Sequence, residues 1–571
     1  DGFRRRQDGA IWYRIDDNNW DFLCSTLEIT AATRNEDGDD WGRFIRVCDR
    51  DGEWHEYAMP MAELAGDGNN YRAKLLSMGL ELAPGRKAKE ALHRLLTLWK
   101  PQARARCVEK LGWHRDVFML PDDTIGEMAG ERLVLQSPDA LQHNFRCAGS
   151  LQGWQDGVGG LSVGNSRLVF SISMAFAAPM LRPLGLEGGG VNLRGASSTG
   201  KTTAADVAGS VCGGGPTGYK TTWRATDNAL ESVASTHNDS LLVLDEIGQI
   251  SPEALGTVAY MLTNGQAKRR MTRSAVARKV LSWRLLYLST GEVGLADKLR
   301  ESRRGARPMA GQEVRVLDVP ADAGAGHGVF EALHGFRSGQ AFADELKRLA
   351  NRDYGFPLRV FIKRLTKENW HELANGLIDR FIGDVVPSGA DGQVRRAAHR
   401  FAIVAAAGHL AQEWDIVPWQ QGEVERAAKR LFDEWLAARG GIEPAEVTAG
   451  IAEVRHFLEL HAIGRFAAWE PDGTKVQNCA GFRKEDCSDG NKPTFYIFPE
   501  VLRRDILGGH DASLITREMA RRGLIKTNSD GRPSTKQRLP DDTERKVYVV
   551  LPAIFEEGDR APTEIKSEPA E

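Results

Sequence analysis

The chain has 571 residues, of which 42% are hydrophobic and 27% charged, so it can bury several cores and is not a disordered polypeptide. Its 75 Lys and Arg residues against 78 Asp and Glu residues give a net charge of −3, which excludes a uniformly basic nucleic-acid binder. Seven cysteines without a CxxC pair fit neither a disulfide framework nor a zinc ribbon, and they indicate a reducing compartment.

The sequence shows no sign of a targeting or membrane-spanning segment. Its start, DGFRRR, lacks the apolar core of a signal peptide. The longest apolar stretches, near 173–181 and 401–407, fall well short of the ~20 residues that span a bilayer. We therefore expect a cytoplasmic protein without a membrane partner.

Residues 1–155 are predicted to form an N-terminal α+β domain that serves as a collar, in oligomerisation or in DNA entry. Short alternating runs predict strands at 24–30, 43–47 and 54–58 and a hairpin over 107–120. An apolar stripe predicts a helix over 86–100. Six of the 14 tryptophans precede Arg115. Their rings could stack on nucleic-acid bases, but we favour the interpretation that they fill a thin core.

Beyond residue 155 strands first alternate with helices, and helices then dominate. The alternation over 156–322 is typical of a parallel sheet, so the fold class is α/β. The segment ADAGAGHG at 321–328 is interpreted as a linker or flexible loop. The rest is predicted to form a helical lid or bundle over 323–445, a winged-helix-like domain over 446–555 and a disordered acidic tail over 556–571.

The segment GASSTGKT at 195–202 matches the phosphate-binding pattern G-x-x-x-x-G-K-[ST] at every fixed position. An apolar run precedes it and a predicted helix, 202–212, follows, so backbone N–H groups can converge on phosphates. We expect ATP to be bound by Gly195, Ala196, Ser197, Ser198, Thr199, Gly200, Lys201, Thr202 and Thr203. Lys201 would reach the β- and γ-phosphates. The flanking pattern disfavours the alternative, a Gly-rich surface turn.

The run SLLVLDE at 240–246 is predicted to be a buried parallel strand that ends in two carboxylates. Asp245 would hold Mg²⁺ together with the Thr202 hydroxyl, and Glu246 would polarise the attacking water. Two solvated acids at a strand end are the alternative. The pair indicates an ATPase.

A third predicted strand, 283–288, is followed by STGE. A polar residue at this position senses the γ-phosphate in additional-strand P-loop proteins. Thr290 is the first choice for this catalytic role and Ser289 the second. An ordinary strand-ending turn is the alternative.

The stretch 264–284 is strongly basic and contains no acidic residue. It lies where ring-shaped helicases insert a hairpin into the central pore, so we expect it to grip a phosphate backbone. A solvated face is the alternative. The predicted DNA-binding residues here are Lys268, Arg269, Arg270, Arg273, Arg278 and Lys279.

An arginine from a neighbouring subunit would stabilise the charge of the transition state. Arg307 and Arg315 are the candidates, with Arg304 third, and surface arginine is the alternative for each. Contacts from the later helix are weaker candidates, at Arg395, Arg396 or Arg400.

Near the end of the chain, Arg517, Arg521 and Arg522 lie on a predicted helix, 513–522, followed by a basic, turn-rich region. This arrangement resembles a recognition helix and wing on DNA. Winged helices also act as protein–protein modules, which is the alternative.

The stretch from about 176 to 320 resembles the AAA+/superfamily-3-like helicase domain of uncharacterised replication proteins of phages, plasmids and integrative elements, which often carry primase modules. The matching segments are FAAPM at 176–180, GGG at 188–190, 195–202, LDE at 244–246, NGQ at 264–266, WR at 283–284, LSTGE at 288–292 and AGQEVR at 310–315. The similarity continues through GQVR at 392–395 and FAIV at 401–404. Ser289-Thr290 stand where better-known superfamily-3 helicases have Asn.

This resemblance implies a bacterial or phage-encoded, hexameric AAA+ ring that uses ATP and Mg²⁺ to move on single-stranded or forked DNA. A primase or polymerase is an expected further partner. The predicted function is an ATP-dependent DNA helicase. One alternative is an initiator, loader or defence ATPase that hydrolyses ATP without unwinding. Another is a winged-helix DNA binder that uses ATP only to assemble.

Overall fold

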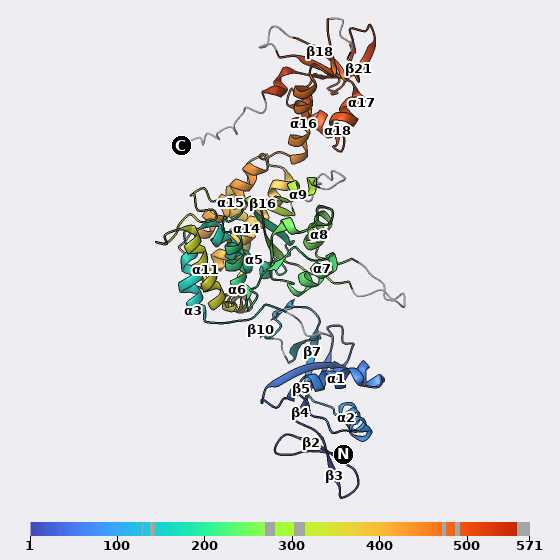
Figure 1. The fold of residues 1–571 in the computed structure, drawn as a ribbon, viewed down its shortest axis with the longest axis vertical. Helices are drawn as coiled ribbons and strands as arrows, with labels where there is room; N and C mark the ends of the chain where they lie inside the picture. The colour runs from blue at the N-terminus through green and yellow to red at the C-terminus, as the bar shows by residue number, and fades with distance from the viewer. Residues whose placement is uncertain are drawn as a thin grey trace. The chain divides into compact units, whose positions relative to one another are not determined.

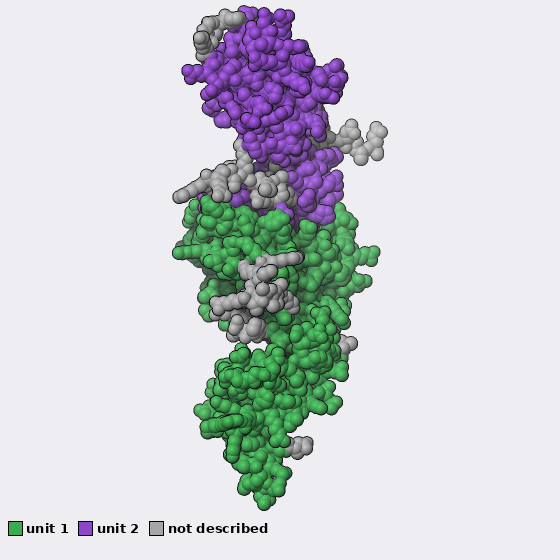
Figure 2. Space-filling view, turned by 90° about the vertical axis from the view of Figure 1, so that its right-hand side faces the viewer, with its two compact units in different colours: residues 1–293, 321–379, 403–428 green, residues 294–320, 380–402, 429–571 purple. Residues whose placement is uncertain are grey.

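The computed structural model describes residues 2–127, 130–136, 143–268, 280–301, 315–470, 476–485 and 492–556. Contacts within the chain define two compact units (Figure 2). Unit 1 comprises residues 1–293, 321–379 and 403–428, and unit 2 comprises 294–320, 380–402 and 429–571. Across the described ranges, every helix is too short or too polar to cross a membrane.

The N-terminal part of unit 1 contains two sheets that share one core. A three-stranded antiparallel sheet has the order β1-β2-β3, and a five-stranded mixed sheet has the order β11-β7-β4-β5-β6. Their strands are β1 (Phe3–Arg5), β2 (Ile11–Arg14), β3 (Trp20–Cys24), β4 (Leu27–Arg34), β5 (Gly42–Cys48), β6 (Trp54–Pro60), β7 (Arg104–Val108) and β11 (Arg132–Leu135). Helices α1 (Asn69–Ser77) and α2 (Arg86–Leu98) contribute Leu75, Leu92, Leu95 and Leu96 to this core (Figure 1).

Two strand predictions for this part are wrong in detail. The run predicted as one strand over 24–30 is split, because Cys24 ends β3 and Leu27 begins β4 with both side chains buried. The predicted hairpin is shorter than expected. It joins β8 (Gly112–His114) to β9 (Val117–Met119), with β10 (Thr124–Ile125) alongside, whereas Cys107 lies in β7 and pairs in parallel with β11.

The prediction that the early tryptophans fill the core is also wrong. Trp113 is buried, but Trp41, Trp54 and Trp99 are 44%, 40% and 48% exposed. Trp12 and Trp20 are partly exposed. The core is made instead by aliphatic side chains of the strands and α2. Apart from Trp113, these tryptophans therefore lie on outer surfaces, where several carry an arginine on the ring face.

Unit 1 also contains the parallel sheet that the sequence predicts. Its strands are β12 (Gly189–Arg194), β13 (Thr221–Thr222), β14 (Leu241–Asp245) and β15 (Leu286–Gly291), in the order β13-β14-β15-β12. The strand β15 thus separates β12 from β14. Close packing at Gly190 requires glycine, since a Cβ there would lie 2.1 Å from the ring of Tyr287.

Helices flank this sheet. They are α5 (Ser166–Ala177), α6 (Lys201–Cys212), α7 (Asp227–Thr236) and α8 (Pro252–Asn264), and α5 packs on α6 (Figure 1). Further along the chain come α11 (Gly339–Arg352), α12 (Phe356–Leu365), α13 (His371–Val385), α14 (Gly392–Glu413) and α15 (Glu423–Ala438). The predicted helical character of this region is confirmed.

The last part of unit 2 combines three helices with a mixed sheet of order β17-β18-β19-β21-β20. The helices are α16 (Ala445–His461), α17 (Pro499–Val501), which continues into a π-helical turn over Leu502–Ile506, and α18 (Ala512–Arg521). The strands are β17 (Phe466–Ala468), β18 (Gly481–Lys484), β19 (Thr494–Ile497), β20 (Thr535–Arg538) and β21 (Glu544–Val550). The predicted tail beyond 556 lies outside the described residues.

Candidate nucleotide-binding site

The loop 195–200 connects β12 to α6, so the predicted strand–loop–helix order is present. Gly200 adopts a left-handed conformation, with φ of 89°, immediately before the helix. A Cβ at this position would also lie 2.8 Å from Val329 Cγ2. No side chain of the described residues caps the first turn of α6, so its N–H groups and its positive dipole end suit a phosphate.

Lys201 is 7% exposed, and its ammonium group is bound to the loop that carries it. Nζ donates to the carbonyl oxygens of Gly195 at 2.8 Å and Ala196 at 2.6 Å. These neutral acceptors hold the cation over the loop without neutralising its charge. The lysine is therefore positioned to exchange carbonyl oxygens for phosphate oxygens.

A cluster of polar side chains joins three elements at one edge of the sheet. The Thr202 hydroxyl, on α6, lies 3.4 Å from Asp245 Oδ1 at the end of β14. The Thr290 hydroxyl, on β15, donates to the same carboxylate oxygen and accepts the backbone N–H of Glu246 at 3.1 Å. One hydroxyl therefore fixes both the orientation of Asp245 and the backbone of Glu246.

The structure distinguishes the two sensor candidates. Adjacent side chains on a strand point to opposite faces. Ser289 is fully buried and accepts the indole N–H of Trp223 at 3.0 Å, so it is part of the packing under the sheet. Thr290 instead contacts the Asp245 carboxylate and the Glu246 backbone, and of the two it alone lies with the predicted site residues.

Glu246 has an unusual backbone conformation. Its φ of 62° and ψ of 78° lie in the left-handed region, which residues other than glycine rarely occupy. Its carboxylate accepts the N–H of Gly248 at 3.3 Å. The chain therefore bends sharply after β14 and turns Glu246 away from the strand direction.

Two charged residues near Asp245 were missed by the motif search. Lys220 Nζ lies 2.8 Å from Asp206 Oδ1 and 3.8 Å from Asp245 Oδ2. Burial raises the pKa of Asp206, and Lys220 opposes this shift. Asp206 follows Thr202 by one helical turn, and this spacing could have indicated from the sequence that it lies near the site. No sequence pattern indicates the position of Lys220.

The segment interpreted as a linker at 321–328 belongs to the site. The Ala321 N–H donates to Arg194 O at 2.7 Å, and the Val329 N–H donates to Thr199 O at 2.8 Å. A Cβ at Gly328, whose φ is 65°, would lie 2.2 Å from that same Thr199 oxygen. The segment thus supports the phosphate-binding loop from outside, and this role corrects the linker interpretation.

The site residues fit a nucleotide with Mg²⁺. The Thr202 hydroxyl and the Asp245 carboxylate present hard oxygen ligands side by side, next to the open first turn of α6. Within the described ranges no group of three or more His, Cys, Asp or Glu side chains could hold a metal by itself.

The other predicted residues have partners of their own or lie outside the described residues. Arg315 is half-buried and its carbonyl accepts from Arg400 at 3.2 Å. Lys268 forms an ion pair with Asp227 at 2.9 Å. Outside the described residues lie Arg269, Arg270, Arg273, Arg278, Lys279, Arg304 and Arg307.

The three arginines predicted to form a recognition helix differ in environment. Arg517 is exposed on α18. Arg521 and Arg522 both form ion pairs with Glu518 and with Glu443. Two of the three guanidinium groups are thus engaged within unit 2.

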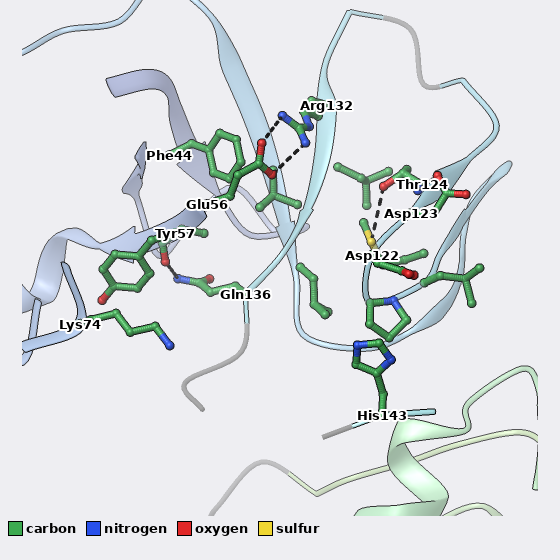
Figure 3. A pocket seen from close by; sticks show the side chains of 17 residues that line it. Phe44, Glu56, Tyr57, Lys74, Asp122, Asp123, Thr124, Arg132, Gln136 and His143 are labelled. Atoms are coloured by element: carbon green, nitrogen blue, oxygen red, sulfur yellow. Dashed lines mark hydrogen bonds and ion pairs between the residues drawn. The ribbon is translucent and has the colours of Figure 1, made fainter. Parts of the chain in front are cut away.

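A cavity of about 630 Å³ lies in the N-terminal part of the chain, away from the phosphate-binding loop. Figure 3 shows Glu56 and Arg132 side by side on one side of it, paired at 3.0 Å. Asp122, Asp123 and His143 line another side. None of the predicted site residues lines this cavity, so it is separate from the nucleotide site.

Comparison with known proteins gave a family match, a similarity to a curated protein and a similarity to solved structures. A family described as a domain of unknown function, DUF927, matches residues 3–282. A stretch of 116 residues is 33% identical to the L-cysteine:1D-myo-inositol 2-amino-2-deoxy-alpha-D-glucopyranoside ligase of Brachybacterium faecium. That stretch is 20% of this chain and spans only 25% of the ligase.

The structural similarity extends much further. The solved structure titled "SCCmec type IV Cch - active helicase" superposes with a TM-score of 0.69, covering 96% of this chain and 97% of the other. The sequences are 15% identical, so the similarity establishes a shared fold. Together with the DUF927 match, it fits the helicase-like family that the sequence resembles.

Proposed function

We propose that the protein is an ATPase whose site is the polar cluster around Asp245. The observation that carries this proposal is the convergence of Lys201, Thr202, Asp245 and Thr290 at one edge of the parallel sheet. The carboxyl ends of parallel strands are where such sheets bind ligands. The loop 195–200 and the first turn of α6 would bind the phosphates.

Each residue then has a physical role. Lys201 leaves the loop carbonyls for the β- and γ-phosphate oxygens. Thr202 and Asp245 hold Mg²⁺, which when bound offsets the charge of those oxygens. Glu246 accepts a hydrogen bond from the attacking water and orients it. Thr290 keeps both acidic residues in place through its two hydrogen bonds.

We further propose that ATP hydrolysis drives unwinding of DNA. The support is the fold shared with an active helicase over nearly the whole chain. A ring of subunits, of the superfamily-3 type and acting in a mobile genetic element, would place an arginine such as Arg315 or Arg307 against a neighbour's ATP. The basic segment 268–279 would grip one strand.

The second candidate is an ATPase that remodels DNA–protein assemblies without unwinding. One observation favours it: Lys268, at the start of the basic segment, already has a carboxylate partner in Asp227. With Lys268 held in this way, the protein would bind DNA without moving along it. Both candidates hydrolyse ATP, so only strand separation discriminates between them.

The test is strand displacement on forked DNA with ATP and Mg²⁺, measured beside phosphate release. Lys201→Ala should abolish both activities, and Lys363→Ala, which changes an exposed lysine on α12, should abolish neither. Hydrolysis without displacement by the wild type would overturn the helicase proposal in favour of the remodeller. Hydrolysis that survives Lys201→Ala would overturn the proposed site.

A further inference from the structure

The small sheet β1-β2-β3 has two faces of different chemistry. Its inner face contributes Ile11 and Leu23 to the N-terminal core, with Phe3 and Tyr13 packed against them. Since alternate residues of a strand point to opposite faces, the outer face carries the intervening side chains. Those are aromatic and basic.

Cross-strand pairs place the outer-face residues next to one another. Arg4 is opposite Trp12, and Trp12 is opposite Phe22 on the next strand. The Trp12 and Phe22 rings meet edge to face, with centroids 6.1 Å apart. Arg14 is opposite Trp20. The face therefore carries the rings of Trp12, Phe22 and Trp20 with guanidinium groups beside them.

Two of these arginines lie flat against ring faces. The Arg6 guanidinium carbon is 3.6 Å from the centroid of the Trp12 ring, and that of Arg4 is 4.5 Å from the Trp20 centroid. Within the described part of the chain, neither arginine has a carboxylate within ion-pair distance. Both are exposed, and their positive charges are not neutralised.

The nearby acidic residues accept hydrogen bonds from neighbouring backbone N–H groups. Asp8 accepts the N–H of Ala10, and Asp16 accepts the N–H groups of Asn18 and Asn19. Asp21 accepts the N–H of Phe22. Asp17 pairs with Arg14 at the edge of this face and is 89% exposed, so this pair is weak.

We propose that the outer face of β1-β2-β3 binds single-stranded DNA, with Trp12 and Trp20 stacking on bases and Arg4 and Arg6 contacting phosphates. A single strand offers unstacked base faces and phosphates together, and both are complementary to this surface. In a duplex the base faces are stacked on one another, so a duplex could interact only with the charges of the arginines.

The energetics allow this exchange. An exposed arginine on a tryptophan ring is a weak contact. A base stacked on an aromatic ring is a stronger one. A base can thus displace the guanidinium, which then turns to the phosphate. The site requires neither ATP nor the basic segment 268–279, so it goes beyond the proposed function and can fail independently of it.

The test is the affinity of the whole protein for a fluorescent 20-nucleotide oligo-dT, measured by anisotropy without nucleotide. Trp12→Leu/Trp20→Leu removes the stacking surface but keeps apolar volume, and it should weaken binding about tenfold or more. Trp12→Phe/Trp20→Phe should recover most of the affinity. Trp41→Ala, which removes an exposed tryptophan just before β5, should have no effect.

The role of the arginines is tested by measuring how DNA affinity depends on salt concentration. Arg4→Ala/Arg6→Ala should reduce the slope of log affinity against log salt by about 1.4, or about 0.7 per phosphate contact. The inference would be overturned if the Leu variant kept the wild-type affinity and the Ala variant kept the wild-type salt slope. It would also be overturned if the wild type bound duplex DNA as tightly as the single strand. A Leu variant with changed sedimentation but unchanged DNA affinity would also overturn it, because the face would then contact protein. DNA-free ATP hydrolysis, measured in parallel, reports on the proposed function separately.

Discussion

The charged side chains of the parallel sheet region and those of the small sheet β1-β2-β3 differ in what they contact. Around the parallel sheet, several charged groups of the site have partners within the chain: Lys201 has loop carbonyls, Asp245 has two hydroxyls and Asp206 has Lys220. Next to the small sheet, Arg4 and Arg6 lie over ring faces and, among the described residues, have no ion-pair partner. Internal partners fix a geometry, whereas ring faces leave a charge available for a ligand.

This contrast has a measurable consequence. Side chains of the parallel sheet should affect catalysis and stability, because each is part of a buried network. Side chains of the small sheet should affect binding and leave stability nearly unchanged, because exposed cation–π pairs contribute little. The predictions below test one side of the contrast or the other.

The largest effect is expected at Thr290. Thr290→Val keeps the shape but removes both hydrogen bonds, so Asp245 and Glu246 lose their common anchor. We expect steady-state ATP hydrolysis to fall about 100-fold, the scale of one lost catalytic hydrogen-bond donor.

Two matched variants support the Thr290 measurement. Thr290→Ser retains the hydroxyl and should keep most of the activity. Ser289→Ala removes a hydroxyl that contacts Trp223 and should lower the melting temperature with little change in rate per folded molecule. A larger catalytic loss in Ser289→Ala than in Thr290→Val would exchange the roles of the two residues.

The next effect is a loss of stability in acid. His237 lies between the Phe145 and Tyr219 rings and donates to Val233 O, and burial lowers its pKa from 6.5 to about 4. The unfolded chain therefore binds a proton between pH 6.5 and 4 where the folded chain does not, so unfolding becomes easier as the pH falls. The contribution is at most about 3 kcal/mol.

Urea denaturation at several pH values measures this contribution. His237→Asn keeps a donor for Val233 O and removes the titrating ring, so its stability should depend less on pH between 6.5 and 4. An unchanged pH slope in this variant would show that other groups cause the acid sensitivity.

The sequence predicted the parts of the site that adjacent residues encode. The loop 195–202, the apolar strand that ends at Asp245 and the strand before Thr290 were each recognisable from a local pattern. The support from 321–330 and the position of Lys220 depend on contacts between residues distant in the chain, which no local pattern carries. The exposure of the tryptophans was mispredicted for the same reason, since composition does not say which face of a strand is covered.

An intermediate effect is expected at Lys220, whose ammonium group lies near the expected Mg²⁺ ligand Asp245. Lys220→Ala removes a competing cation, so Mg²⁺ should bind more tightly. We expect the Mg²⁺ concentration for half-maximal hydrolysis to fall about tenfold, on a Coulomb estimate for partly buried charges. Lys220→Arg should behave as the wild type, and an unchanged midpoint in the Ala variant would exclude this role.

The smallest effect is expected on α18. Its arginines lie in a basic stretch of sequence, as do those of the small sheet. Two of them, however, have partners within the chain, as the charged groups around the parallel sheet do. Because Glu443 and Glu518 already engage Arg521, Arg521→Ala should change DNA affinity less than twofold. Glu443→Gln/Glu518→Gln should instead raise DNA affinity several-fold by releasing the two guanidinium groups. If Arg521→Ala weakens oligonucleotide binding as much as Arg4→Ala/Arg6→Ala, then internal pairing does not decide which arginines bind DNA. The contrast between the two sheets would then lose its physical basis.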